Sequence, residues 1–156
     1  MRACIAHCLA IALITISSVC SAETPDGSTV RAGTFKQVEG ETWTGQPDAR
    51  RPVSPGDGVQ TSERVSTGQA GATSIILKDG TVVTLGPNTT VDLSQFDYNS
   101  TTQEGNFLLD LLEGSIRVVT GLLAKANPES VKVKTPTSVV GVRGTDFIVQ
   151  VEPASK

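Results

Sequence analysis

Cysteine and histidine are almost missing from this sequence. Three cysteines and one histidine occur in 156 residues, namely Cys4, Cys8, Cys20 and His7. All four precede residue 23, in a segment that we expect to be removed. The mature chain would then have no thiol and no imidazole, which excludes a cysteine nucleophile, a histidine-based triad and a zinc site with nitrogen or sulfur ligands. It would also need to be stable without disulfides.

Aromatic and basic residues are scarce as well. Aromatics make up 4% of the chain, with one tryptophan and one tyrosine. Without Arg2, 12 Lys and Arg would face 16 Asp and Glu, a balance that argues against nucleic acid or anionic lipid as a partner. The carboxylates show no spacing typical of a metal site or an acid/base pair. We therefore expect no metal and no cofactor.

The N-terminus has the pattern of a secretory signal. Arg2 is followed by a largely apolar run, 5–19, and by the small residues of Cys20-Ser21-Ala22. This order predicts a signal peptide over 1–22 that is cleaved after about Ala22, leaving a periplasmic or secreted protein. Lipidation of Cys20 is an alternative, but Ser17 and Val19 fit a lipoprotein signal poorly. A retained anchor is less favoured, because the apolar run is short for a bilayer span.

The rest of the chain has the pattern of an all-β protein. Its length allows one domain, which we place at 30–152, between a flexible tail at 23–29 and a C-terminal tail at 153–156. Many short apolar runs are separated by Gly, Pro and Asn, which predicts short antiparallel hairpins packed as a single sandwich-like or roll-like domain.

Several elements follow from local patterns. Asp79-Gly80 joins the apolar runs 74–77 and 81–85, which predicts a hairpin with a type I′ turn. We also predict a second hairpin around Glu113-Gly114, an exposed loop over 96–105 and one helical turn over 122–127. Further strands are expected at 30–38, 131–135, 138–142 and 145–151. Thr135-Pro136 should break the strand that begins at Val131, because proline lacks an N–H.

Two stretches of the chain have distinctive motifs. Residues 135–147 read TPTSVVGVRGTDF, and residues 72–91 read ATSIILKDGTVVTLGPNTTV. The first resembles the closing signature of the FecR-like domain family, and the second is similar to the central hairpin of that family. The resemblance spans about 33–151 and implies a β domain of the kind found in iron-citrate signalling regulators. It also implies an opening hairpin over 40–51, with Val38 on one arm and Trp43 near the turn or on the other arm.

Four residues are candidate binding residues. Arg143, between two glycines, offers a five-donor guanidinium that either grips an anionic ligand or pairs with Asp79 or Asp146, and we favour the pairing. Asp79 is expected to form the turn rather than bind a ligand. Trp43 is either a surface for a sugar or partner or a core anchor, and we favour the core. Tyr98 lies in the expected exposed loop and is a further candidate for ligand binding.

The sequence favours a non-catalytic binding or regulatory module. It is expected to sense or relay an envelope signal through a partner protein, or to bind a small ligand or glycan. The expected layout has no cytoplasmic helical domain and no internal membrane span, so the protein would not signal across the membrane alone. The alternative is a structural, surface-assembly or glycan-binding protein of the envelope. An enzyme is not expected, since only carboxylates and arginines would be available for catalysis.

Overall fold

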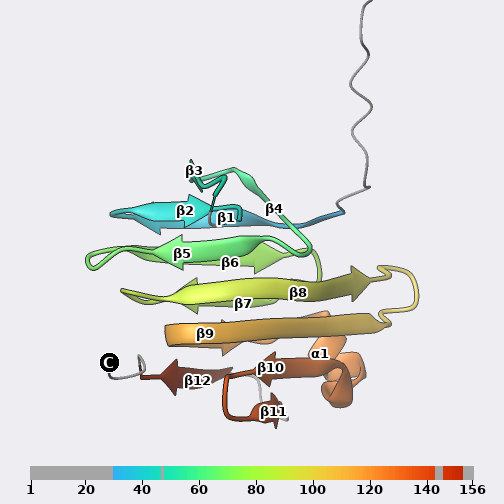
Figure 1. The fold of residues 1–156 in the computed structure, drawn as a ribbon. Helices are drawn as coiled ribbons and strands as arrows, with labels where there is room; N and C mark the ends of the chain where they lie inside the picture. Colours follow the sequence, from blue (N-terminus) through green and yellow to red (C-terminus); the bar gives the residue numbers. More distant parts are fainter. Residues whose placement is uncertain (1–29, 47, 143–145, 153–156) are drawn as a thin grey trace, which may run out of the picture.

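The computed structural model describes residues 30–46, 48–142 and 146–152. The predicted signal peptide, the tail at 23–29 and the C-terminal tail at 153–156 lie outside these residues. The described chain forms one curled sheet of 12 strands, nearly all antiparallel, folded into two packed layers (Figure 1). The predicted all-β fold class is therefore confirmed.

The two layers are named here after their central strands. The β6 layer runs, in order of pairing, through β4 (Gly58–Gln60), β1 (Arg31–Glu39), β6 (Ala72–Leu77), β7 (Val82–Leu85), the C-terminal half of β9 (Gly105–Val119) and β12 (Asp146–Val151). The β8 layer runs through β3 (Arg51–Pro52), β2 (Thr42–Thr44), β5 (Arg64–Thr67), β8 (Thr90–Tyr98), the N-terminal half of β9, β10 (Val131–Lys134) and β11 (Val139–Gly141).

Strand β9 belongs to both layers, so the predicted hairpin at Glu113-Gly114 is wrong. Its 15 residues run without a turn. The pairing with β8 slips by one residue at Leu112, and Gly114 has a φ of 89°. The Thr89 hydroxyl accepts a hydrogen bond from the Ser115 N–H at 3.0 Å. The bulge at Leu112 and the positive φ of Gly114 lie where the strand passes from one layer to the other. Glycine adopts such a φ without steric cost.

The hairpin predicted at Asp79-Gly80 is confirmed as the β6–β7 connection. Its turn differs from the expected type I′, which needs positive φ at both central residues. Only Gly80 has a positive φ, of 83°. The Gly80 N–H donates to the Leu77 carbonyl at 3.0 Å, and the Leu77 N–H donates to the Thr81 carbonyl at 2.8 Å. The loop therefore holds three residues, with the glycine last.

The predicted opening hairpin over 40–51 is confirmed in part, because β2 and β3 pair antiparallel there. Val38 is not on either of its arms, since it lies on β1 in the other layer. β1 pairs with β4 and β6, whereas β2 pairs with β3 and β5. The chain crosses between the layers after Glu39. Trp43 is then placed between Thr42 and Thr44, which are both buried. Because side chains alternate along a strand, Trp43 is directed outward, is half-buried and is not the core anchor that we favoured.

The core lies between the two layers. It includes Phe35 and Leu85 from the β6 layer and Phe96, Phe107 and Leu111 from the β8 layer, all nearly inaccessible to solvent. The Phe96 and Phe107 rings meet edge to face, with centroids 6.2 Å apart. Each such side chain stabilises the fold by about 1.5–3 kcal/mol through burial. The predicted loop at 96–105 is correspondingly shorter, because β8 continues to Tyr98 and leaves only 99–104.

A short helical connection closes the fold between β9 and the parallel strand β10. It consists of α1 (Leu122–Ala126) and the 3₁₀ turn η1 (Pro128–Ser130), as the predicted helical turn at 122–127 suggested. Leu123 is fully buried and fixes α1 to the core. A parallel pair needs such a crossover, since a tight turn joins only antiparallel strands. Among the described helices, none is long and apolar enough to cross a membrane.

Candidate functional site

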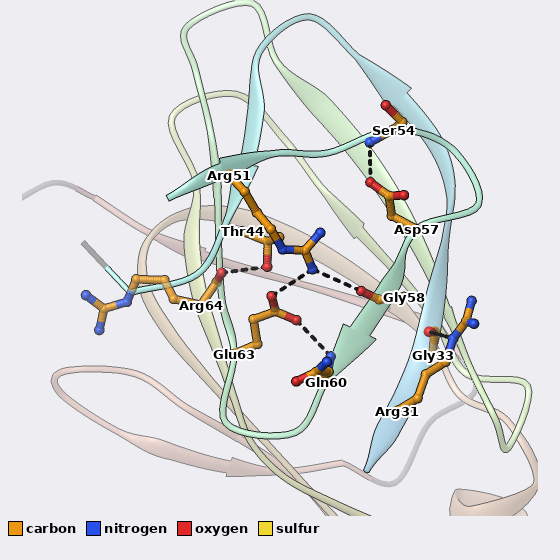
Figure 2. Close-up of polar contacts among 10 residues, drawn as sticks. All are labelled: Arg31, Gly33, Thr44, Arg51, Ser54, Asp57, Gly58, Gln60, Glu63 and Arg64. Atoms are coloured by element: carbon orange, nitrogen blue, oxygen red, sulfur yellow. Dashed lines mark hydrogen bonds and ion pairs between the residues drawn. The ribbon is translucent and has the colours of Figure 1, made fainter. Parts of the chain in front are cut away.

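The edge of the molecule formed by β3 and β4, called here the N-terminal edge, is closed by side chains. Arg51 on β3 donates to the Glu63 carboxylate at 3.1 Å and to the Gly58 carbonyl of β4 at 3.4 Å. Glu63 also accepts a hydrogen bond from the Gln60 N–H at 2.8 Å. Figure 2 shows the Arg51 guanidinium between these acceptors, so that one side chain joins the edge strands of both layers.

Further features keep this edge from pairing with another strand. β3 has two residues, one of them Pro52, and β4 has three. Proline has no N–H to offer a new neighbour. The Arg31 side chain lies against Gly58 of β4 and donates to the Gly33 carbonyl at 3.2 Å and to the Thr34 hydroxyl at 2.9 Å on β1. Short, charged and proline-containing edge strands resist edge-to-edge association.

The opposite edge, formed by β11 and β12, is called the C-terminal edge. β11 is as short as β4, but β12 has none of this protection from the described residues. β12 has six residues, and among the described strands it pairs only with β9. It contains neither proline nor lysine, and its Ile148 is 71% exposed. β11 pairs only with β10 within the same described part of the chain, and its Val139 is 62% exposed.

An apolar surface adjoins β12 on the outer face of the β6 layer. The strand register places Ile76, Val82 and Val119 in one row across β6, β7 and β9. Ile148 follows in the next row, opposite Arg117. Ile76, Val119 and Ile148 are exposed and Val82 is half-buried, because the alternate residues of these strands face the core. We call these four residues the Ile148 surface.

The outer face of the β8 layer is charged instead. Arg64 and Asp92 lie opposite each other on β5 and β8 and form two hydrogen bonds of 2.6 Å. Hydrogen bonding to Asp92 raises the pKa of Arg64. Asp110 follows on β9, with the Lys134 ammonium 4.0 Å from its carboxylate. The molecule thus has one polar face and one partly apolar face.

One ion pair lies beside the Ile148 surface and holds β12 to β9. Arg117 donates to both oxygens of Asp146, at 2.9 and 2.5 Å. This hydrogen bonding lowers the pKa of Asp146 and raises that of Arg117, which keeps both groups charged. Both side chains are largely exposed. The pair therefore fixes the position of β12 without covering its outer side.

Asp79 is buried in the β6–β7 turn and is 1% exposed. One of its carboxylate oxygens accepts from the Thr81 N–H at 3.0 Å and the other from the Thr81 hydroxyl at 2.6 Å. Its carbonyl accepts from the Leu122 N–H at 2.9 Å, which attaches the turn to α1. Both sides of the carboxylate are therefore used inside the fold.

The other candidate residues lie apart from one another. Trp43 is on the outer face of β2, with the end of its ring against Gly68. Tyr98 ends β8 and lines a groove of about 530 Å³. Arg143 lies outside the described residues, and its two expected partners, Asp79 and Asp146, are bonded to Thr81 and Arg117. Among the described residues, no three His, Cys, Asp or Glu side chains gather as a metal site would require.

Sequence reasoning missed Ile148, Val119 and Arg117. Residues 147–149 are Phe, Ile and Val, so hydrophobicity alone does not show which side of the strand faces solvent. Only the pairing with β9 decides it. The usable signal was the absence of proline and lysine from β12, because edge strands commonly carry one of them.

The comparisons with known proteins give one match. A family model described as FecR protein matches residues 63–156, which is more than half of the chain. The match begins just before β5 and covers every later element. β1 precedes it, although β1 pairs with β6 and contributes the buried Phe35 to the core. No curated protein and no solved structure matches the chain.

Proposed function

Since this chain belongs to the FecR family, as its two motifs predicted, we propose that it is a non-catalytic regulatory module of the cell envelope that binds a partner protein along β12. The family association with signalling supports the regulatory part of this proposal. The observation that carries the binding part is the six-residue edge strand, which no described strand pairs on its outer side and which adjoins an exposed apolar surface.

Binding would occur by strand addition. An extended segment of the partner would form backbone hydrogen bonds with the free side of β12, which provide affinity without regard to sequence. Alternate side chains of the added strand would then stand beside Ile148, on the same face of the sheet as the Ile148 surface. Arg117 lies opposite Ile148 on β9. Its guanidinium could also donate a hydrogen bond to a carboxylate or a backbone carbonyl of the partner. The protein would act in the periplasm or outside the cell, after removal of its signal peptide.

Self-association through the same strand is the second candidate, and the sequence of β12 favours it. Antiparallel pairing of two β12 strands with Ile148 on the two-fold axis would place Asp146 opposite Gln150 of the second copy. Like charges would not face each other, and the two isoleucines would meet. This arrangement corresponds to a structural or surface-assembly role.

Site-specific photocrosslinking in the producing cells tests the proposal. A photoreactive amino acid is placed at Gln150 on β12 or at Gln60 on β4, two glutamines exposed on edge strands. We expect a heterologous adduct from position 150 and none from position 60. An added Ile148→Lys substitution should abolish the adduct while changing the free energy of unfolding by less than about 0.5 kcal/mol, since Ile148 is exposed.

The mass of the adduct separates the candidates. An adduct of twice the monomer mass from position 150 indicates self-association and contradicts a partner protein. Equal adducts from positions 150 and 60, or no adduct from position 150, would contradict binding at β12 altogether.

A further inference from the structure

A groove formed by residues distant in sequence from β12 is lined by an aromatic ring and several polar side chains, as many ligand sites are. Its volume is about 530 Å³, and its lining includes Lys78 from the β6–β7 turn, Asp97 and Tyr98 from the end of β8, and Asn99, Ser100 and Glu104 from the following loop. Three separate parts of the chain therefore meet there, the third being Val30, which directly precedes β1. Nearly all of these side chains are exposed or half-exposed, so the groove is open along its length.

The loop that forms one wall is held in shape by its own hydrogen bonds. The Asn99 side-chain oxygen accepts from the Thr101 N–H at 2.9 Å, and the Asn99 carbonyl accepts from the Gln103 N–H at 2.8 Å. The Asn99 N–H donates to the Glu104 carbonyl at 2.9 Å. A ligand would therefore meet a wall that is already ordered, which lowers the entropy cost of binding.

Tyr98 provides an aromatic surface that is fixed from beneath. Its ring packs partly against the core, where the neighbouring residue Phe96 is buried. Its hydroxyl makes no hydrogen bond with any residue that the structure describes. An amphipathic ring held in this way offers an apolar face together with a donor and acceptor for a ligand.

The charges in the groove select the ligand class. Lys78 makes no ion pair with a described residue, and Glu104 makes none through its carboxylate, while the Asp97 carboxylate accepts from Gln95 at 2.9 Å. A polyanion would meet two carboxylates, and a polycation would meet the ammonium. A neutral molecule with many hydroxyls can use all of these groups, because each hydroxyl both donates and accepts.

From these observations we infer that the Tyr98 groove binds a neutral oligosaccharide. A sugar ring lies against Tyr98 through its C–H face, and its hydroxyls bond to Lys78, Ser100 and Glu104. The open ends of the groove suit a segment of a longer chain rather than an enclosed monosaccharide. The site is separate from β12 and does not depend on the function proposed above.

Fluorine NMR tests this directly, because Tyr98 and Trp43 are the single tyrosine and tryptophan. The full-length sequence is labelled with 3-fluorotyrosine and 5-fluorotryptophan and titrated with cellotetraose, chitotetraose, a tetragalacturonate and a chitosan tetramer. We expect the two neutral tetramers to shift the Tyr98 resonance saturably, with no change at Trp43. No shift with either neutral tetramer, a stronger effect of a charged one, or equal shifts at both reporters would overturn the inference.

Matched variants locate the contact. Lys78→Gln and Glu104→Gln should each weaken the apparent affinity by about tenfold, the loss of one hydrogen bond to a charged group. Lys36→Gln, an exposed lysine on β1 outside the groove, should leave the affinity unchanged. An unchanged Trp43 resonance verifies that each variant is folded. Equal weakening by all three substitutions would place the binding elsewhere and contradict the assignment.

Discussion

The N-terminal and C-terminal edges of this molecule are built on opposite plans. At the N-terminal edge, Arg51 connects β3 to β4 and Pro52 removes a backbone donor. At the C-terminal edge, β12 is longer, has no such residue and exposes Ile148. Edge strands of natural proteins are commonly protected against pairing with other chains, as β3 and β4 are here. The unprotected β12 therefore calls for a functional explanation.

The largest effect is expected from replacing Gly114, which lies where β9 passes from one layer to the other. In Gly114→Ala, the alanine would have to adopt a φ of 89°, and its Cβ would lie 2.6 Å from the Asn88 carbonyl oxygen. We expect the free energy of unfolding to fall by about 3 kcal/mol, measured by urea denaturation.

The matched control is Gly141→Ala on β11, where an added Cβ meets no atom within 4 Å. Its stability should be that of the wild type. If the two alanine substitutions lower the free energy of unfolding equally, the passage of β9 between the layers does not depend on the backbone conformation of Gly114.

An intermediate effect is expected from opening the N-terminal edge. Arg51→Ala removes the partner of Glu63, whose side chain is only 12% exposed. The expected loss is about 1 kcal/mol, because the pair is partly screened by solvent. Urea denaturation measures the loss, with Arg50→Ala as a control, since Arg50 is exposed and forms no ion pair within the described chain. A photocrosslinker at Gln60 should then begin to form adducts if Arg51 is what protects this edge.

The smallest effect is a pH dependence of the C-terminal edge. Arg117 lowers the pKa of Asp146, mainly by hydrogen bonding. The stabilisation is therefore complete above the unfolded pKa of about 3.9 and is lost as pH falls through the lower value of the folded state. We expect the stability difference between the wild type and Asp146→Asn to shrink toward low pH and high salt. A difference that stays constant with pH would show that Asp146 contributes no linked proton.

Part of this fold was predictable because its signals are local. The β6–β7 hairpin follows from Asp79-Gly80 between two apolar runs, and β10 from the alternation of valine and lysine at 131–134. Even there the turn type was mistaken, since Asp79 keeps a negative φ while its carboxylate bonds to Thr81. The sequence shows that Gly80 lies in the turn. The length of the β6–β7 loop depends on which residues pair across it, and the sequence does not show that.

The rest depended on partners distant in sequence. Glu113-Gly114 has the composition of a turn, yet the flanks of β9 pair with β8 and β7, and no local pattern indicates that. Trp43 faces outward because the pairing of β2 with β3 and β5 places its two neighbours, Thr42 and Thr44, on the core side. The Arg117–Asp146 pair joins residues 29 positions apart. For the same reason the Ile148 surface became visible only after β12 was placed beside β9.

Strand β9, which both layers share, also determines how this molecule unfolds. β9 is hydrogen-bonded to β7, β8, β10 and β12, so neither layer has a complete set of backbone partners without it. Local openings at the C-terminal edge can release β12 alone, whereas any opening that frees β9 releases both layers at once. The amide protons of β9 should therefore exchange with solvent only through global unfolding, and heat should melt the two layers as a single cooperative unit.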